Sequence, residues 1–212
     1  NGEEVRSGMG KTVFIIHTNQ LAGGDLIRLF NQMAPDVTVR NIIDDSILPE
    51  VLTAGVTPRI VRRYFEYATL AQDAGADLIF NQCSSVGEVA DMARSLVRVP
   101  IVKIDERMAE VACRTGSRIG VVATAASTMG PTTRLLRRTA ERLAKSISMV
   151  EEVRTDAFER MLAGDKQGHN VLLLQTIRNL YSRVDVVVCA QGSMLALKPD
   201  LGETPIPVLM SP

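Results

Sequence analysis

The sequence has little of several features that would point to a specialised class of protein. It contains no tryptophan, three cysteines and two histidines among 212 residues. So few cysteines argue against a dense disulfide framework, and two histidines provide little for a classical zinc site. We therefore expect no bound metal. If the cysteines have a role beyond packing, the sequence favours thiol chemistry.

The chain also lacks an excess of either charge. Its 24 Lys and Arg residues balance 24 Asp and Glu residues, so there is no net positive charge to attract nucleic acid or an anionic membrane. No apolar run approaches the roughly 20 residues of a membrane span, and residues 1–11 have no apolar core of the kind found in secretory signals. We expect a soluble, cytoplasmic protein without a nucleic-acid or membrane partner.

Short apolar segments alternate with longer amphipathic ones along the chain. Such alternation is typical of βαβ units on a parallel sheet, and strands that are apolar throughout indicate a sheet covered on both faces. The predicted strands span residues 13–17, 37–43, 77–80, 101–104, 118–123, 147–151, 184–189 and 207–210. The predicted helices span residues 25–33, 58–74, 86–96, 106–114, 131–145, 156–162 and 170–182.

An internal near-repeat divides this pattern into two similar halves. VFIIHT, which ends at Thr18, resembles IGVVAT, which ends at Thr124, and DLIFNQC, which ends at Cys83, resembles DVVVC, which ends at Cys189. Both pairs are offset by 106 residues, and the strands VPIV and IPVL are offset by 107. Repeats of this kind decide the fold, so we predict two α/β halves, residues 11–104 and 105–212, each with a four-stranded parallel sheet.

The two cysteines Cys83 and Cys189 each stand at the carboxyl end of a predicted strand. Ligands of open α/β sheets bind at these ends. If a pseudo-twofold axis relates the halves, the thiols would face each other across a cleft. One could remove a proton from a carbon while the other returns one to the opposite face, because a thiol with an ordinary pKa of about 8.5 can serve as acid or base near neutral pH.

Small polar side chains surround both cysteines. Such groups, together with backbone N–H groups, can bind a carboxylate and stabilise an enolate-like charge. The candidates are Asn81, Gln82, Ser84 and Ser85 beside the first cysteine, Gln191, Gly192 and Ser193 after the second, and Thr18, Asn19, Thr124 and Ser127 at the ends of the first strand of each half.

At these residues the sequence resembles the aspartate/glutamate/hydantoin racemase superfamily. The matching segments are NQCSSVGE around Cys83, VVATAAST after the fifth strand and CAQGSM around Cys189, together with PIVKID and PIPVLMSP. The resemblance extends over residues 12–212. It implies two flavodoxin-like halves with the active site between them.

The resemblance also implies an activity. It points to a cofactor-independent racemase or epimerase in which Cys83 and Cys189 form the acid/base pair and a small carboxylate or carbonyl compound is the substrate. Ser84, Ser85, Thr124 and the residues after Cys189 would contact the substrate, and a homodimer or higher homo-oligomer is plausible.

Departures from the family pattern leave other activities open. Glutamate-specific members carry Asp-Ser after the first strand and Thr-His after the second cysteine, whereas this chain has His17-Thr18-Asn19 and Ala190-Gln191. Decarboxylases and cis-trans isomerases belong to the same superfamily, and a non-catalytic metabolite-binding protein is a further alternative. Because no arginine flanks either cysteine, we predict a substrate with one carboxylate or a neutral carbonyl ring rather than free aspartate or glutamate.

Several other residues have both a structural and a functional interpretation. His17 could polarise a substrate or be a hydrogen-bonded core residue, and Lys103 could bind an anion or lie on the surface. Asp45 could bind a substrate ammonium, although turn and cap roles are commoner for an Asp-Asp-Ser segment. We expect packing roles for Cys113 and His169, and we interpret the basic cluster Arg134, Arg137, Arg138 and Arg142 as an exposed helix face.

Overall fold

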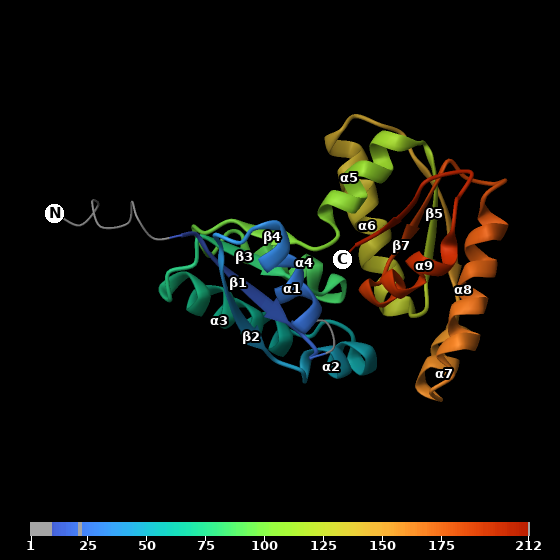
Figure 1. Cartoon of the computed structure of the whole chain (residues 1–212). Coiled ribbons are helices and arrows are strands. Elements are labelled where there is room, and N and C mark those ends of the chain that lie inside the picture. Colours follow the sequence, from blue (N-terminus) through green and yellow to red (C-terminus); the bar gives the residue numbers. More distant parts are fainter. Residues whose placement is uncertain (1–9, 21–22, 212) are drawn as a thin grey trace. The chain divides into compact units, whose positions relative to one another are not determined.

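Two separate four-stranded parallel sheets organise the chain, as predicted from the alternating pattern (Figure 1). The computed structural model describes residues 10–20 and 23–211. It divides into one unit that ends at Lys103 and another that begins at Ile104. The strands of both sheets run parallel, and helices connect them.

The first sheet has the strand order β2-β1-β3-β4. This order of four parallel strands is that of a flavodoxin-like sheet. Its strands are β1 (Thr12–His17), β2 (Thr38–Ile43), β3 (Leu78–Asn81) and β4 (Ile101–Lys103). The helical segments of this unit are α1 (Gly23–Met33), α2 (Ile47–Ala54), α3 (Pro58–Asp73), the 3-10 turn η2 (Ser84–Val86) and α4 (Gly87–Ala93).

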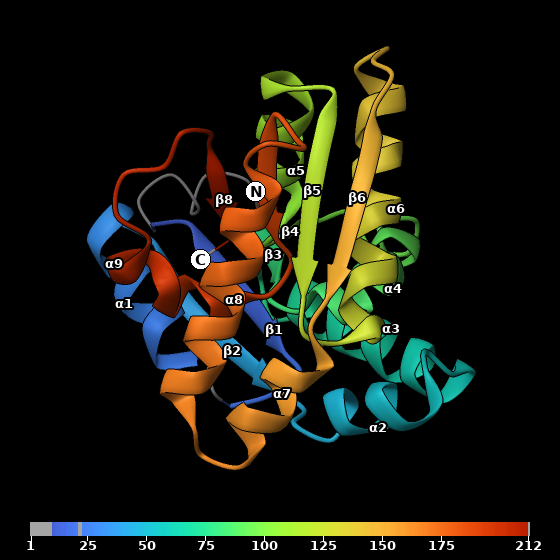
Figure 2. The same cartoon turned by 90° about the vertical axis from the view of Figure 1, so that its right-hand side faces the viewer.

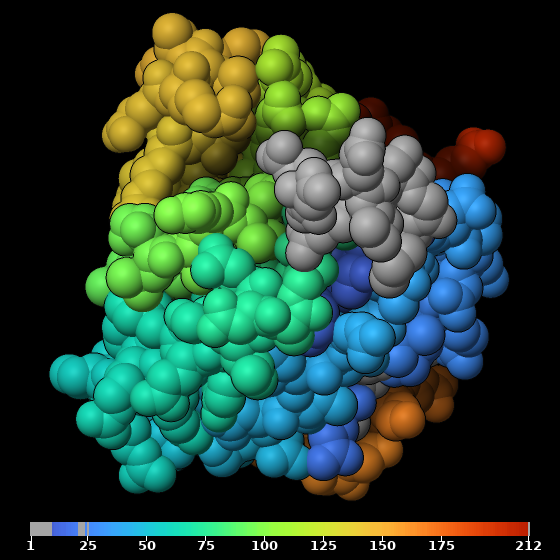
Figure 3. All heavy atoms as spheres, turned by 90° about the vertical axis from the view of Figure 1, so that its left-hand side faces the viewer, coloured from blue at the N-terminus to red at the C-terminus, as the bar shows by residue number. Residues whose placement is uncertain are grey.

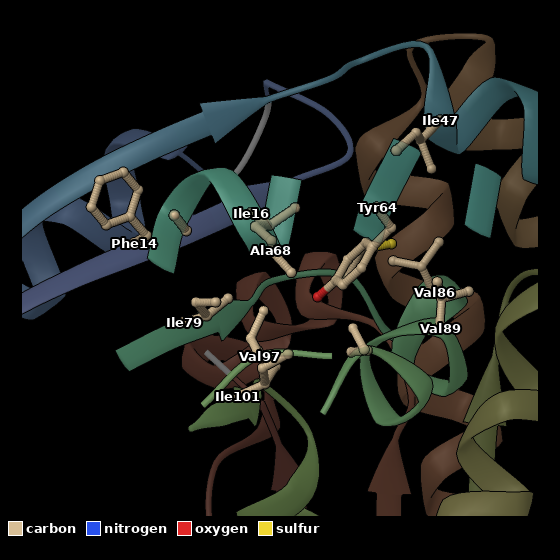
Figure 4. Close-up of a cluster of buried hydrophobic side chains, with 14 of the residues drawn as sticks. Phe14, Ile16, Ile47, Tyr64, Ala68, Ile79, Val86, Val89, Val97 and Ile101 are labelled. Carbon is tan, nitrogen blue, oxygen red and sulfur yellow. The ribbon is translucent and has the colours of Figure 1, made fainter. Parts of the chain in front are cut away.

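Helices cover both faces of the first sheet. On one face, β1 and β3 bury Ile16 and Ile79 against apolar residues of α3 and α4, in a cluster that includes Tyr64 (Figure 4). On the other face, Phe30 of α1 packs edge-on against Phe80 of β3, with ring centroids 5.6 Å apart. Strands buried on both faces explain why their sequences are apolar throughout.

The second sheet repeats the same order as β6-β5-β7-β8. Figure 2 shows β5 and β6 side by side and pointing in the same direction. The strands are β5 (Arg118–Ala123), β6 (Ser148–Val153), β7 (Val186–Cys189) and β8 (Val208–Met210). The helical segments are α5 (Glu106–Thr115), α6 (Ala126–Arg142), α7 (Thr155–Leu162), α8 (Lys166–Leu180), the 3-10 segment η3 (Gly192–Leu197) and α9 (Lys198–Leu201).

Alternate residues of β5 and β7 belong to two different cores. Val186 and Val188 pack with residues of α5 and α6 on one face of the sheet. Val187 and Cys189 pack with residues of α8 and η3 on the other face. Successive side chains of a strand point to opposite faces, so the Cys189 side chain is directed into the core beneath α8.

In each sheet, an aspartate just before the third strand accepts a hydrogen bond from the backbone of the first strand. Asp77 accepts a hydrogen bond from the backbone N–H of Thr12 at 2.8 Å, and Asp185 accepts one from the N–H of Arg118 at 2.8 Å. The Arg118 guanidinium also donates to Asp185, which lowers the pKa of this carboxyl to about 2. The same device in both units supports the predicted internal repeat.

Several helices differ from the sequence prediction; among them, the short helix α9 was not predicted and α4 ends three residues earlier than predicted. Helix α2 was not predicted; its Pro49 is tolerated in the first turn, where the missing N–H has no intrahelical partner. Helix α8 begins at Lys166 rather than at residue 170, since the Asp165 side chain caps it by accepting from the N–H of Gly168. Helix α6 begins at Ala126 and continues through Pro131, which was predicted as its start.

The close packing of β5 against α8 gives a prediction about stability. A methyl group at Gly120 would lie 3.0 Å from Leu180 Cδ1 and 3.3 Å from Val184 Cγ2. Gly120→Ala should therefore lower the free energy of unfolding by about 1–2 kcal/mol in urea denaturation. Gly24→Ala in α1 is the control, because its Cβ meets nothing within 4 Å and should leave stability unchanged or slightly higher. Equal stability of Gly120→Ala and the unchanged protein would contradict this account.

Candidate functional site at the carboxyl ends of the strands

The strand registers show that Cys83 and Cys189 do not occupy equivalent positions. Strands β1 and β5 correspond with the predicted offset of 106 residues. Ile16 pairs with Asn81, however, and its counterpart Val122 pairs with Cys189. The third strands are therefore offset by 108 residues and not by 106, so the predicted superposition of Cys83 on Cys189 is wrong.

The corrected register assigns each cysteine a different counterpart. Cys83 precedes η2, just as Gln191 precedes η3, and both residues have extended backbone angles. Cys83 is thus the counterpart of Gln191, and Cys189 is the counterpart of Asn81. The internal repeat in the sequence was aligned by matching the two cysteines. The structurally equivalent residues are instead Asp77 and Asp185, which make the same hydrogen bond at the start of each third strand.

Cys83 stands at the first turn after β3. Its side chain is 8% exposed and belongs to the core of the first unit. Its backbone carbonyl oxygen accepts two hydrogen bonds, one from the N–H of Val86 at 3.3 Å and one from Asn81 Nδ2 at 2.9 Å. These bonds therefore hold the backbone that carries the thiol at the carboxyl edge of the sheet.

Cys189 is enclosed in the core of the second unit. Its side chain is fully buried among Leu173, Ile177 and Met194. Burial disfavours the thiolate and raises the pKa of Cys189 to about 12. A thiol in this setting stays protonated near neutral pH and does not serve as a base there.

Two predicted substrate-binding residues bind each other in the second unit. The side-chain oxygen Oε1 of Gln191 accepts from the backbone N–H of Thr124 at 2.7 Å and from Thr124 Oγ1 at 2.9 Å. Thr124 therefore supplies two donors to one carbonyl oxygen. Since Gln191 corresponds to Cys83 and Thr124 corresponds to Thr18, the first unit has a thiol where the second has this amide.

Buried polar atoms without a partner gather at the matching place in the first unit. Thr18 Oγ1 and Gln82 Oε1 are buried and have no hydrogen-bond partner among residues 10–20 and 23–211. Both residues lie at the carboxyl edge of the sheet, where the N–H of Gln82 donates to the carbonyl of Ile16 in the neighbouring strand. Buried polar groups are nearly always satisfied, so these two atoms are candidates to bind a polar ligand.

His17, the last residue of β1, is a buried, neutral histidine. Its Nε2 lies 2.8 Å from Asn41 Oδ1, and with Nε2 as donor the Nδ1 atom becomes an acceptor. Burial lowers the pKa of His17, and the hydrogen bond to Asn41 opposes this effect only in part. Nδ1 has no partner within the described part of the chain, so His17 has an unused acceptor at the carboxyl end of β1.

The remaining predicted site residues differ in exposure. Ser85 is buried, and Asn19 and Ser84 are half-buried at the ends of their strands. Gly192 and Ser193 are exposed in η3. Ser127 lies in the first turn of α6, and its Oγ has no partner among the described residues.

Structural roles account for several other candidates. Asp44 accepts from Ser46, Arg63 and Tyr67, which ties the end of β2 to α3. Its neighbour Asp45 accepts from Gln20. Lys103 is buried and forms a 2.8 Å ion pair with Asp91.

The two packing expectations and the basic cluster also have structural explanations. His169 lies inside α8, where its Nδ1 is 2.9 Å from the carbonyl oxygen of Ala157 in α7. Cys113 is buried in α5, and its Sγ is 3.5 Å from the carbonyl oxygen of Leu136. The four arginines of α6 are exposed, as expected.

Two broader features bear on the class of site. Within the described ranges, no three His, Cys, Asp or Glu side chains converge as ligands for a metal ion. No helix in this part of the chain is long and apolar enough to span a membrane.

Comparison with known structures shows the same fold. A putative Asp/Glu racemase from Yersinia pestis superposes with a TM-score of 0.70 at 16% identity, over 94% of this chain and 93% of that one. Glutamate racemase from Francisella tularensis, in complex with D-glutamate, gives 0.71 at 10% identity, over 94% of this chain and 76% of that one. Allantoin racemase from Klebsiella pneumoniae gives 0.62 at 16% identity, over 94% and 82%.

Sequence comparison identifies the family. No curated protein matches the chain by sequence. The family model described as Asp/Glu/Hydantoin racemase, however, matches residues 24–212, which is most of the chain. The chain therefore belongs to the Asp/Glu/hydantoin racemase family of isomerases.

Proposed function

We propose that this chain transfers a proton to or from a carbon next to a carboxylate or carbonyl group, with Cys83 as the acid/base group. The observation that carries the proposal is the contrast between the two units at equivalent positions. Thr124 donates two hydrogen bonds to the amide oxygen of Gln191, whereas Thr18 has a buried, unpartnered Oγ1 beside the strand that leads to Cys83.

The amide of Gln191 suggests what the first unit binds. A carbonyl oxygen occupies the donor pair of Thr124, so the equivalent donors of Thr18 suit a carboxylate or carbonyl oxygen of a substrate. Hydrogen bonds to this oxygen would stabilise the negative charge that develops when the neighbouring carbon loses its proton. Cys83, at the counterpart position of Gln191, would receive that proton or supply it.

Racemisation by two thiols is the first form of this chemistry. It requires a second group that serves the opposite face of the carbon, and Cys189 was predicted for that role from the sequence. Thiol acid/base chemistry of this kind calls for no cofactor. The role of Cys189 stays a prediction, and its full burial does not favour it.

One-thiol chemistry is the second candidate, and the strand register favours it. Because the counterpart of Cys83 is Gln191 and not a second thiol, Cys83 is the one thiol at such a turn among the described residues. Decarboxylation followed by protonation on one face, or cis-trans isomerisation, needs only one such group. Both reactions use the same oxygen site at Thr18.

The substrate is proposed to carry one carboxylate or a neutral carbonyl ring. The solved relatives are named for glutamate, aspartate and allantoin, so the family's fold serves amino acids and a ureide alike. At the carboxyl ends of β1 and β3, the buried side-chain atoms without a partner in the described chain belong to Thr18, Gln82 and His17, which are uncharged. Lys103, the cation considered for a second carboxylate, is paired with Asp91.

Exchange of the α-proton in deuterated water tests the proposal. A panel of monocarboxylic amino acids, hydantoins, hydroxy acids, aspartate and glutamate would be followed by NMR, with chiral chromatography to measure inversion. We expect exchange for at least one monocarboxylic or carbonyl-ring compound and a lower kcat/KM for aspartate and glutamate. Failure of the whole panel to exchange would contradict the proposal, and a preference for aspartate or glutamate would contradict the substrate class.

A further inference from the structure

Asn81 connects a helix of the first unit to the backbone of Cys83. The hydroxyl of Tyr64, in α3, donates to Asn81 Oδ1 at 3.0 Å, and Asn81 Nδ2 donates to the Cys83 carbonyl oxygen at 2.9 Å. Tyr64 and Asn81 are fully buried. Figure 4 shows the Tyr64 ring packed among Ile16, Ala68 and Val86.

The orientation of the Asn81 amide follows from its two partners. The Cys83 carbonyl can only accept, so the amide nitrogen must face it and the amide oxygen must face Tyr64. Burial raises the pKa of Tyr64, so its hydroxyl remains a donor over the pH range in which enzymes work. Both polar ends of the amide are thus used inside the unit, which suits a supporting role better than the substrate contact considered from the sequence.

We propose that Tyr64 and Asn81 are positioning residues that fix the direction of the Cys83 thiol through its backbone. The inference rests on the proposed function, in which Cys83 transfers a proton. The Cys83 carbonyl is clamped between Asn81 Nδ2 and the N–H of Val86, so the peptide that carries the thiol cannot rotate without breaking one of these bonds. Proton transfer is sensitive to placement errors of about 1 Å, and such clamping keeps the error small.

The second unit supports this interpretation by contrast. The counterpart of Asn81 is Cys189, which is enclosed by apolar residues. The counterpart of Cys83 is Gln191, and its side chain is held directly by Thr124. Within the described chain, the Tyr–Asn connection therefore occurs in the unit that places a thiol at the turn.

The test compares two tyrosine-to-phenylalanine variants of α3 in the full-length protein. Tyr64→Phe removes the hydroxyl that holds Asn81. Tyr67→Phe is the matched control, since the same group on the same helix donates instead to Asp44 Oδ2 at 2.7 Å. The measurements are the rate of Cys83 alkylation by iodoacetamide from pH 6 to 9.5, resolved by peptide mass spectrometry, and kcat and KM for α-proton exchange.

We expect Tyr64→Phe to lower kcat about tenfold or more with KM within about twofold, and to change the pH profile of Cys83 alkylation. Tyr67→Phe should leave both profiles unchanged. Asn81→Leu should resemble Tyr64→Phe, and the double variant should show no further loss, because residues that act through one connection are not additive. Melting temperatures of all variants would show that the comparison is between folded proteins.

Two results would overturn the inference. One is an alkylation profile and kcat for Tyr64→Phe equal to those of Tyr67→Phe. The other is independent, additive effects of Tyr64→Phe and Asn81→Leu. A different result would contradict the proposed function itself, namely proton exchange that survives in Cys83→Ala. That result does not depend on the tyrosine variants.

Discussion

Replacing Cys83 with alanine is expected to reduce α-proton exchange by a factor of about 10²–10⁴, the usual contribution of a general acid or base. Alanine keeps the backbone bonds to Asn81 and Val86 and removes only the group that is proposed to move the proton. KM should change little, because Thr18 and not the thiol is proposed to bind the substrate oxygen. The measurement is exchange in deuterated water with the best compound of the substrate panel, at matched folded concentration.

Cys189→Ala is the matched control for this loss. It removes a thiol from the other unit, and since the Cys189 side chain is fully buried, we expect exchange to stay within a few-fold of the unchanged protein. Loss of inversion in both alanine variants would instead support the two-thiol mechanism predicted from the sequence. Normal exchange in Cys83→Ala would contradict the assignment of Cys83 itself.

Stability at high pH should depend strongly on Cys189. Its pKa is raised to about 12 in the folded protein, against about 8.5 for an ordinary thiol, so the unfolded chain releases this proton first. The stability that this protonated thiol contributes is therefore fully present below pH 8.5. It falls by roughly 1 kcal/mol per pH unit as the pH rises from there toward 12. Urea unfolding at pH 7.5, 9 and 10, under reducing conditions, would measure the loss.

Cys189→Ala should remove that part of the pH dependence. The variant starts with lower stability at pH 7.5, because it leaves a small cavity in the core, but its free energy of unfolding should fall less between pH 7.5 and 10. Burial also raises the pKa of Cys113, so some dependence on pH remains in both proteins. Parallel curves for the two proteins would show that Cys189 ionises as an ordinary thiol.

Much of the fold could be predicted because its signals are local. Apolar β-branched runs separated by amphipathic stretches predicted all eight strands, and the repeat predicted their division into two similar sheets. The helix predicted at residues 58–74 is α3, whose start carries local signals: Thr57 accepts from the N–H of Ile60, and Pro58 stands in its first turn. Helix α2 was not predicted. Its Pro49 does not interrupt the helix, because it lies in the first turn.

The candidate site was predicted only in part, because it depends on register. A shift of two residues keeps a side chain on the same face of a strand, so hydrophobic pattern alone cannot distinguish an offset of 106 from 108. The two cysteines matched by identity, whereas Asp77 and Asp185 make the equivalent hydrogen bonds. Tyr64 was assigned to the apolar face of its helix, and the sequence gave no sign that its hydroxyl meets Asn81.

The aspartates at the amino ends of β3 and β7 also matter for protein engineering. They secure strand pairing at one edge of each sheet, while the residues that differ between the units lie at the opposite edge. At that edge, Cys83 and Gln191 lie just beyond the paired residues of β3 and β7, each at the start of the turn that follows its strand. A designer can therefore vary these two turn positions while the aspartates at the other end of each strand keep the register.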